Sequence, residues 1–176
     1  MAPELQRRFD AMEQQREFLR NRAFSLSDAQ LVWKPSASDW SVQQITEHLV
    51  LSEETVGRPQ EGVVKSEAPM FRILPRRLRR ALILGALRRG TVLPLPSPNI
   101  EPKGDVPLPE LLIRWQAARS ELNRFLSTLQ GSETRYSHPV LGPLTVTQML
   151  ELAQTHTAYH TRQMEALLGR AEFSKN

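Results

Sequence analysis

The chain has 176 residues, of which 40% are hydrophobic and 24% charged, a composition typical of a soluble globular domain with its own core. It contains no cysteine, which excludes disulfides, a thiolate zinc site and a cysteine nucleophile. The net charge is +4, and the basicity is local, because residues 71–90 contain seven arginines and no acidic residue.

The sequence predicts neither a secretory signal nor a membrane-spanning helix. Residues 1–10 carry four charged side chains and no apolar run, so they do not form a secretory signal. The longest apolar run, residues 81–87, is far shorter than the roughly 20 residues of a membrane-spanning helix. We therefore expect a single cytoplasmic domain over residues 1–176.

The first predicted element is a helix over residues 3–22, because proline at position 3 suits a first helical turn and apolar residues recur at helical spacing. Arg16 interrupts its apolar stripe. We interpret Arg16 as a surface arginine that extends into solvent, with contact to an anionic substrate group as the alternative. Residues 25–39 predict a connection with a short turn near residues 28–33.

Two later helices begin with the same capping pattern. Ser41 with Gln44 forms a predicted capping box at the start of one, and Thr145 with Gln148 forms a predicted box at the start of the last. An apolar pair flanks each box at the spacing of a hydrophobic staple, namely Trp40 with Ile45 and Leu144 with Met149. Both helices therefore have sharply defined starts.

An arginine-rich segment and a proline-rich segment lie between these two helices. Residues 72–89 predict an amphipathic helix with an apolar face made of Leu74, Leu78, Ala81 and Leu82. We interpret it as a bundle helix with solvated arginines; the alternatives are self-association as a homodimer, docking on an anionic membrane and, as a partner we do not expect, nucleic acid. Residues 91–109 contain six prolines, which predicts an extended segment crossing the outside of the bundle.

A one-faced apolar stripe next predicts a long helix that ends at Gly131. The stripe consists of Leu111, Trp115, Ala118, Leu122, Phe125 and Leu129. We find no strong segment that alternates with period two. The expected fold class is therefore all-α, an antiparallel four-helix bundle with a long proline-rich and arginine-rich connection.

Three histidines are the strongest candidates for chemistry. His156 and His160 are four residues apart, so their imidazoles lie on one helix face and can bind one ion. His48 follows the Ser41 cap at a phase that also directs it toward the bundle axis. A shared divalent ion would remove the free-energy cost of burying three imidazoles without partners.

Other polar residues have weaker claims on this site. Gln163 shares the helix face of His160 and could orient a ligand or a water, with a polar contact at the helix end as an equal alternative. His138 lies in a predicted turn, where a partly exposed loop residue is the favoured interpretation and the site mouth the alternative. Glu47 and Glu151 point away from the histidines, so no carboxylate is an obvious general base.

The sequence resembles the DinB-like superfamily of four-helix bundles in three places. These are Trp40-Ser41 leading to Glu47-His48, residues 138–145 (HPVLGPLT) and residues 156–163 (HTAYHTRQ). The resemblance implies a zinc or nickel ion held by His48, His156 and His160. It also implies that a low-molecular-weight thiol is a candidate cosubstrate, since some members of the superfamily use one.

Three neutral imidazoles leave a divalent ion with an open coordination position, the arrangement typical of catalytic zinc. Our hypothesis is a metal-dependent transferase or hydrolase acting on a small-molecule electrophile, in which the ion activates water or a thiolate. One alternative is a structural metal site closed by a fourth protein ligand. Another is a protein that docks on a larger partner through its arginine-rich helix.

Overall fold

The computed structural model describes residues 1–56, 74–129, 134–138 and 140–173. These residues form six α-helices, one short 3₁₀ helix and a two-stranded hairpin. The helices are α1 (Pro3–Phe24), α2 (Asp28–Val32), α3 (Val42–Val56), α4 (Arg76–Arg89), η2 (Pro98–Ile100), α5 (Leu108–Ser127) and α6 (Val146–Leu168), and the strands are β1 (Thr134–His138) and β2 (Gly142–Thr145).

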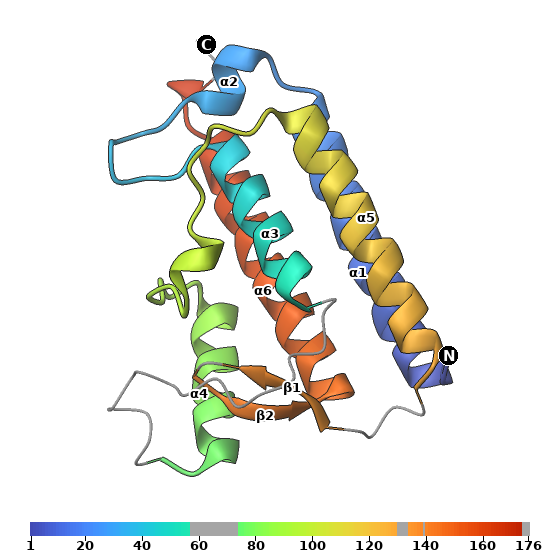
Figure 1. Ribbon diagram of the computed structural model, residues 1–176. Coiled ribbons are helices and arrows are strands. Elements are labelled where there is room, and N and C mark those ends of the chain that lie inside the picture. The colour runs from blue at the N-terminus through green and yellow to red at the C-terminus, as the bar shows by residue number, and fades with distance from the viewer. Residues whose placement is uncertain (57–73, 130–133, 139, 174–176) are drawn as a thin grey trace.

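Four long helices, α1, α3, α5 and α6, form the predicted bundle (Figure 1). In this view α1 and α6 run upward, whereas α3 and α5 run downward. The most extensive packing joins α1 to α6 and α3 to α5, so each closely packed pair is parallel. The two pairs meet in antiparallel fashion, which gives two helices in each direction.

Both predicted capping boxes are confirmed. The Ser41 hydroxyl accepts from the Gln44 amide at 3.2 Å, and the Gln44 side chain accepts from the Ser41 amide at 3.3 Å. Thr145 and Gln148 make the same two hydrogen bonds at 3.2 and 3.1 Å. These reciprocal bonds satisfy amides that the first helical turn leaves unpaired, and they fix where α3 and α6 begin.

The buried core consists of two apolar clusters. One contains Leu19, Trp115 and Met164, and the other contains Met12, Leu122 and Leu150. Along α1, α5 and α6, buried polar side chains separate the residues of the two clusters; they are Arg16, Arg119, Thr157 and His160. The bundle therefore has a polar layer at mid-height, and the histidines belong to it.

Arg16 is not the surface arginine we expected. Its side chain is only 5% exposed, and it donates to Glu13 at 3.0 Å and to Glu17 at 2.9 Å. Arg119, on α5, is 1% exposed and forms ion pairs with Glu53 at 2.5 Å and Glu13 at 3.1 Å. These charges are buried because each has an opposite charge within reach, which the periodicity of one helix cannot reveal.

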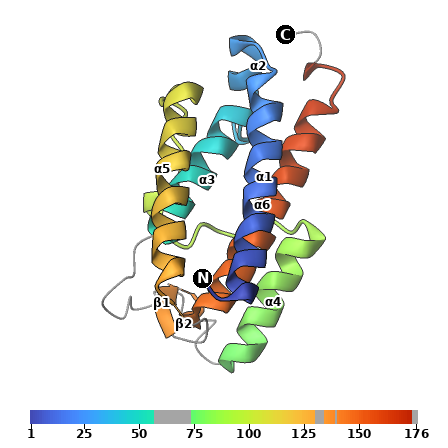
Figure 2. The same ribbon diagram turned by 90° about the vertical axis from the view of Figure 1, so that its right-hand side faces the viewer.

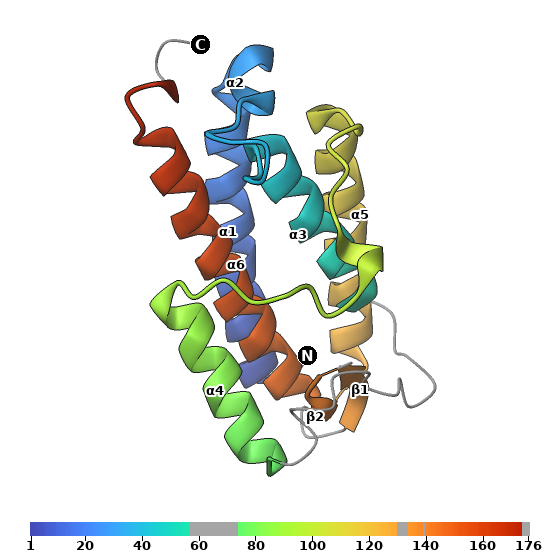
Figure 3. The ribbon, with the colours of Figure 1, turned by 90° about the vertical axis from the view of Figure 1, so that its left-hand side faces the viewer.

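A segment of residues 91–107, here called the crossing segment, runs from α4 across the bundle to α5 as predicted (Figure 3). Side chains of α3 hold it in place. Gln43 donates to the carbonyl oxygens of Gly104 and Val106, and Glu47 accepts from the Gly104 amide at 2.6 Å. Gly104 has a φ of +79°, and a Cβ there would lie 3.0 Å from Gln44, so glycine is required.

The hairpin was not predicted. Its strands have five and four residues and pair in antiparallel register, with Tyr136 opposite Leu144 and His138 opposite Gly142. Such short strands, one of which contains Pro143, give too few alternations for period two to be recognised. The long helix α5 ends at Ser127, before the predicted Gly131, which lies outside the described residues.

The arginine-rich helix α4 lies along the outside of the bundle, beside α6 (Figure 2). The face it buries contains Ile83, Leu84 and Leu87, whereas Leu78, Ala81 and Leu82 of the predicted apolar face are exposed. That prediction of the buried face was wrong. No helix in the described part of the chain is long and apolar enough to cross a membrane.

Candidate metal centre

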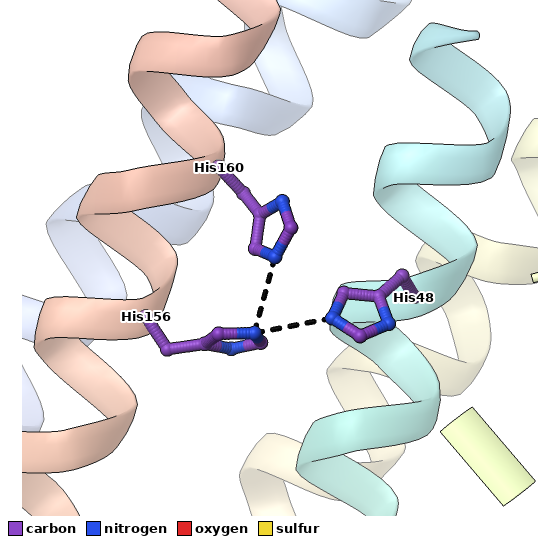
Figure 4. Close-up of side chains that lie close together, drawn as sticks. All are labelled: His48, His156 and His160. Atoms are coloured by element: carbon purple, nitrogen blue, oxygen red, sulfur yellow. Dashed lines mark hydrogen bonds between the residues drawn. The ribbon is translucent and has the colours of Figure 1, made fainter. Parts of the chain in front are cut away.

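Three imidazoles from two helices converge in the polar layer (Figure 4). His48 comes from α3, and His156 and His160 come from consecutive turns of α6. The Nε2 atom of His156 lies 3.1 Å from the Nε2 atom of His48 and 3.1 Å from that of His160. Each ring offers one nitrogen, and these three nitrogens lie within 4.8 Å of one another.

The Nδ1 atoms of His48 and His160, which do not face the other histidines, are hydrogen-bonded to oxygen acceptors that orient the rings. The Nδ1 atom of His48 donates to the carbonyl oxygen of Ile100 at 2.7 Å, and that of His160 donates to the Oε1 atom of Gln163 at 2.8 Å. Carbonyl and amide oxygens only accept, so each Nδ1 carries the hydrogen and each Nε2 keeps its lone pair. Both lone pairs face the Nε2 atom of His156.

One hydrogen on the Nε2 atom of His156 could bond to only one of these two lone pairs. A cation among the three nitrogens would instead be contacted by all of them, which is the pattern of a metal site whose ligands have fixed tautomers. The donor set therefore fits a divalent ion. That these three histidines are the metal ligands stays a prediction, and their geometry supports it.

Burial keeps these imidazoles neutral. His48 and His160 are 1% and 4% exposed, and burial lowers the pKa of His160 to about 3. Burial also lowers the pKa of His48 and of His156, and for His156 the neighbouring His160 and His48 add to the effect. Neutral imidazole is the form that binds a metal. Because His156 stays partly exposed, solvent has access on its side.

An aromatic ring that we assigned only to a hydrophobic staple covers one side of the three histidines. The centroid of the Trp40 ring lies 4.9 Å from that of His48 and 6.0 Å from that of His160, on which it stacks. The rings of Tyr159 and His160 pack in a T-shaped arrangement with their centroids 4.8 Å apart. The position of Trp40 next to the Ser41 cap, eight residues before His48, was the available signal.

No aspartate or glutamate of the described residues joins the three histidines. Glu47 binds the crossing segment, and Glu151 pairs with Arg80 and with Arg88, the latter at 3.2 Å. Both carboxylates are thus engaged elsewhere, as predicted. A general base would have to come from outside the described carboxylates or from the ion itself.

A family model described as the DinB superfamily matches residues 11–164. The chain belongs to the DinB superfamily. The uncharacterized protein YuaE of Bacillus subtilis (strain 168) is 28% identical over 155 residues, which is 86% of this chain and 91% of YuaE. The resemblance in sequence is thereby confirmed at the level of the family.

A solved structure agrees with this membership. YfiT from Bacillus subtilis, described as a probable metal-dependent hydrolase with an unusual four-helix bundle topology, superposes with a TM-score of 0.62. The match covers 96% of this chain and 88% of that of YfiT, at 17% sequence identity. At this identity the likeness establishes the fold, a DinB-type four-helix bundle.

The fourth histidine of this DinB-superfamily chain lies outside the three-histidine group. His138 ends β1 and is partly exposed, and its Nδ1 atom accepts from the amides of Val140 and Leu141 at 3.1 and 3.2 Å. Burial lowers its pKa to about 4. His138 thus holds the hairpin turn, and a place at the site mouth stays a prediction.

These two amide bonds predict an acid-sensitive hairpin. The His138 pKa is about 4 in the folded chain and 6.5 in the unfolded chain, so between these values only the unfolded chain gains a proton. Its contribution to stability is therefore full above pH 6.5 and is lost as the pH falls toward 4. We expect His138→Asn, which keeps an acceptor but does not titrate, to lose less Tm than the wild type over this range. Equal losses would contradict the assignment.

Proposed function

We propose that this protein is a metal-dependent hydrolase that acts on a small electrophilic molecule. The observation that carries the proposal is the convergence of three neutral imidazole nitrogens, without a carboxylate among the described residues, beside a partly exposed His156. The description of YfiT as a probable metal-dependent hydrolase supports the same class of activity. His48, His156 and His160 would hold zinc or nickel.

The residues of the site would have separate roles in this activity. His48 and His160 would bind through Nε2, because their Nδ1 atoms are occupied by Ile100 and Gln163. Trp40 would exclude water from its side of the site, so that substrate approaches past His156. When bound, the divalent ion would supply Lewis acidity, lowering the pKa of water to about 7 and polarising the electrophile.

Neutral ligands matter for this chemistry. Imidazoles leave the full charge of the cation uncompensated, which favours deprotonation of water at neutral pH. The low pKa of His160 and the lowered pKa of His156 keep protons from competing for the site at that pH. The site would therefore work without a carboxylate base.

The experiment is metal analysis followed by hydrolysis of small activated esters and amides. Protein purified without chelators should contain, or take up, one zinc or nickel ion per chain. Product release should stop after chelation and return when the metal is restored. Protein that binds neither metal would overturn the proposal, as would hydrolysis that persists without metal.

Two rival outcomes are distinguished in the same assay. Consumption of an added low-molecular-weight thiol, in step with loss of the electrophile, would assign a thiol transferase instead of a hydrolase. A structural ion would make the fold collapse on chelation while no substrate is ever turned over. Coordination spectroscopy would then show four protein ligands and no exchangeable position.

Gln163→Ala is expected to weaken metal binding by about 10- to 100-fold, the usual cost of removing a hydrogen-bond partner of a ligating histidine. The amide oxygen of Gln163 holds the Nδ1–H group of His160, and alanine leaves that ring free to rotate. Gln163→Glu keeps an oxygen acceptor and should retain most of the affinity. Competition titration with a zinc-sensitive dye measures the difference; equal weakening in both variants would contradict this role.

A further inference from the structure

Helix α4 has two apolar faces, and only one of them packs against the bundle. On the inner face Leu84 and Leu87 are buried beside α6, and Arg162 donates to the Leu87 carbonyl oxygen at 2.6 Å. Arg80 adds an ion pair with Glu151 of α6. These contacts fix which side of α4 faces away from the protein.

The outer face is apolar at its centre. Leu78 and Leu82 are one turn apart and are 45% and 44% exposed, with exposed Ala81 between them. Val92, just beyond the end of the helix, is also exposed. Large apolar side chains at the centre of an outward face are unusual for a solvated helix, and a grouping of them indicates a contact surface.

The six arginines of α4 fall into two groups. Three of them make contacts within the fold: Arg79 donates to the Val140 carbonyl oxygen, and both Arg80 and Arg88 bind Glu151. Arg76, Arg77 and Arg89 are exposed, and the described residues offer them no hydrogen bond or ion pair. Residues 74–92 contain no acidic residue, so the helix itself offers these three cations no opposite charge. Arg76 and Arg77 directly precede Leu78 in the exposed first turn, and Arg89 follows Leu82 by two turns.

We propose that the outer face of α4 docks the protein on an anionic membrane surface. Leu78 and Leu82 would enter the boundary between headgroups and acyl chains, and Arg76, Arg77 and Arg89 would contact lipid phosphates. An in-plane helix with an apolar centre and basic flanks has the physical form of a peripheral membrane contact. This inference is independent of the metal centre.

The combination of leucines and arginines on α4 favours a lipid surface over nucleic acid and over a second copy of the helix. A nucleic-acid backbone offers phosphates to the arginines but leaves the two leucines without an apolar partner. A second copy of α4 would cover the leucines but would bring two sets of uncompensated arginines together. An anionic bilayer provides both phosphates and an apolar layer.

The test is co-sedimentation of the full chain with vesicles of phosphatidylcholine alone or mixed with phosphatidylglycerol. Binding should require phosphatidylglycerol and should fall steeply between roughly 50 and 200 mM salt, because screening weakens the contacts to phosphate. No binding to anionic vesicles at the lower salt concentration would overturn the proposal. Equal binding to neutral vesicles would overturn it as well.

Two double variants separate the electrostatic and apolar contributions. Arg76→Glu with Arg77→Glu should reduce partitioning about tenfold or more. The matched control, Arg7→Glu with Arg124→Glu on exposed positions of α1 and α5, changes the net charge equally and should retain binding within about threefold. Equal losses would show attraction by net charge alone and would overturn the proposal.

Leu78→Gln with Leu82→Gln keeps residues of good helix propensity and removes the apolar centre, so it should also weaken vesicle binding. Circular dichroism checks that α4 and the bundle stay folded. An unchanged vesicle affinity in this variant, together with binding to a DNA duplex, would assign nucleic acid instead. A concentration-dependent dimer that the same change dissociates would assign a second copy instead.

Discussion

His156→Ala is expected to reduce the affinity for zinc or nickel by more than about 100-fold and to remove metal-dependent hydrolysis. Loss of an outer partner of a ligating histidine already costs about 10- to 100-fold, and a lost ligand should cost more. The Nε2 atom of His156 is the one that lies 3.1 Å from both other Nε2 atoms. Its removal leaves two nitrogens, too few to hold an ion against water.

Thermal unfolding distinguishes this loss from damage to the fold. A ligand at 1,000 times its dissociation constant stabilises the folded state by about 4 kcal/mol, so added metal should raise the Tm of the wild type. The same addition should leave the Tm of His156→Ala unchanged. Because His156 is partly exposed, the metal-free variant should differ from the metal-free wild type by only about 1 kcal/mol.

His138→Ala is the matched control, since it removes the remaining histidine of the chain, which lies outside the three-histidine group. It should keep the metal-induced rise in Tm even if the hairpin is weakened. A rise in Tm that survives in His156→Ala but disappears in His138→Ala would show that the ligand set is wrong.

Arg119→Met is expected to lower the free energy of unfolding by about 3–5 kcal/mol, the cost of leaving a buried charge without its partner. Arg119 is 1% exposed, and its guanidinium lies 2.5 Å from a carboxylate oxygen of Glu53, which is itself buried. Burial raises the pKa of Glu53, and the charge of Arg119 opposes that shift. Without Arg119 the buried carboxylate of Glu53 must either stay ionised without its partner or take up a proton.

Urea unfolding at neutral pH measures this effect. The double variant Glu53→Leu with Arg119→Met removes both charges and should recover most of the loss, because an apolar pair needs no partner. Glu13→Ala is a useful comparison, since Glu13 is more exposed and should cost about 1 kcal/mol or less. A cost below about 1 kcal/mol for Arg119→Met would contradict the view that Glu53 and Arg119 form a buried ion pair shielded from water.

The sequence predicts the starts of the helices and the candidate metal centre best. A capping box depends on residues three apart, and the His156–His160 pair depends on residues four apart, so local spacing is enough for both. His48 could be placed because its distance from the Ser41 cap sets its phase. Membership of the DinB superfamily then agrees with the family resemblance.

Features that depend on distant partners could not be predicted. Glu53 and Arg119 are 66 residues apart, and the residue type alone assigns an arginine to the surface. The carbonyl oxygen that orients His48 belongs to the backbone of Ile100, and backbone groups carry no signature in a sequence. The face of α4 was misassigned because this helix has two apolar faces and periodicity cannot choose between them.

The bond from His48 to Ile100 makes the crossing segment part of the ion-binding equilibrium. Gln43 and Glu47 hold the same segment at Gly104 and Val106, so the position of the Ile100 carbonyl depends on hydrogen bonds made four and six residues further along the chain. Coupling of this kind is reciprocal. An ion that fixes His48 should slow amide hydrogen exchange at Gly104, and a loosened crossing segment should release the ion to the same extent.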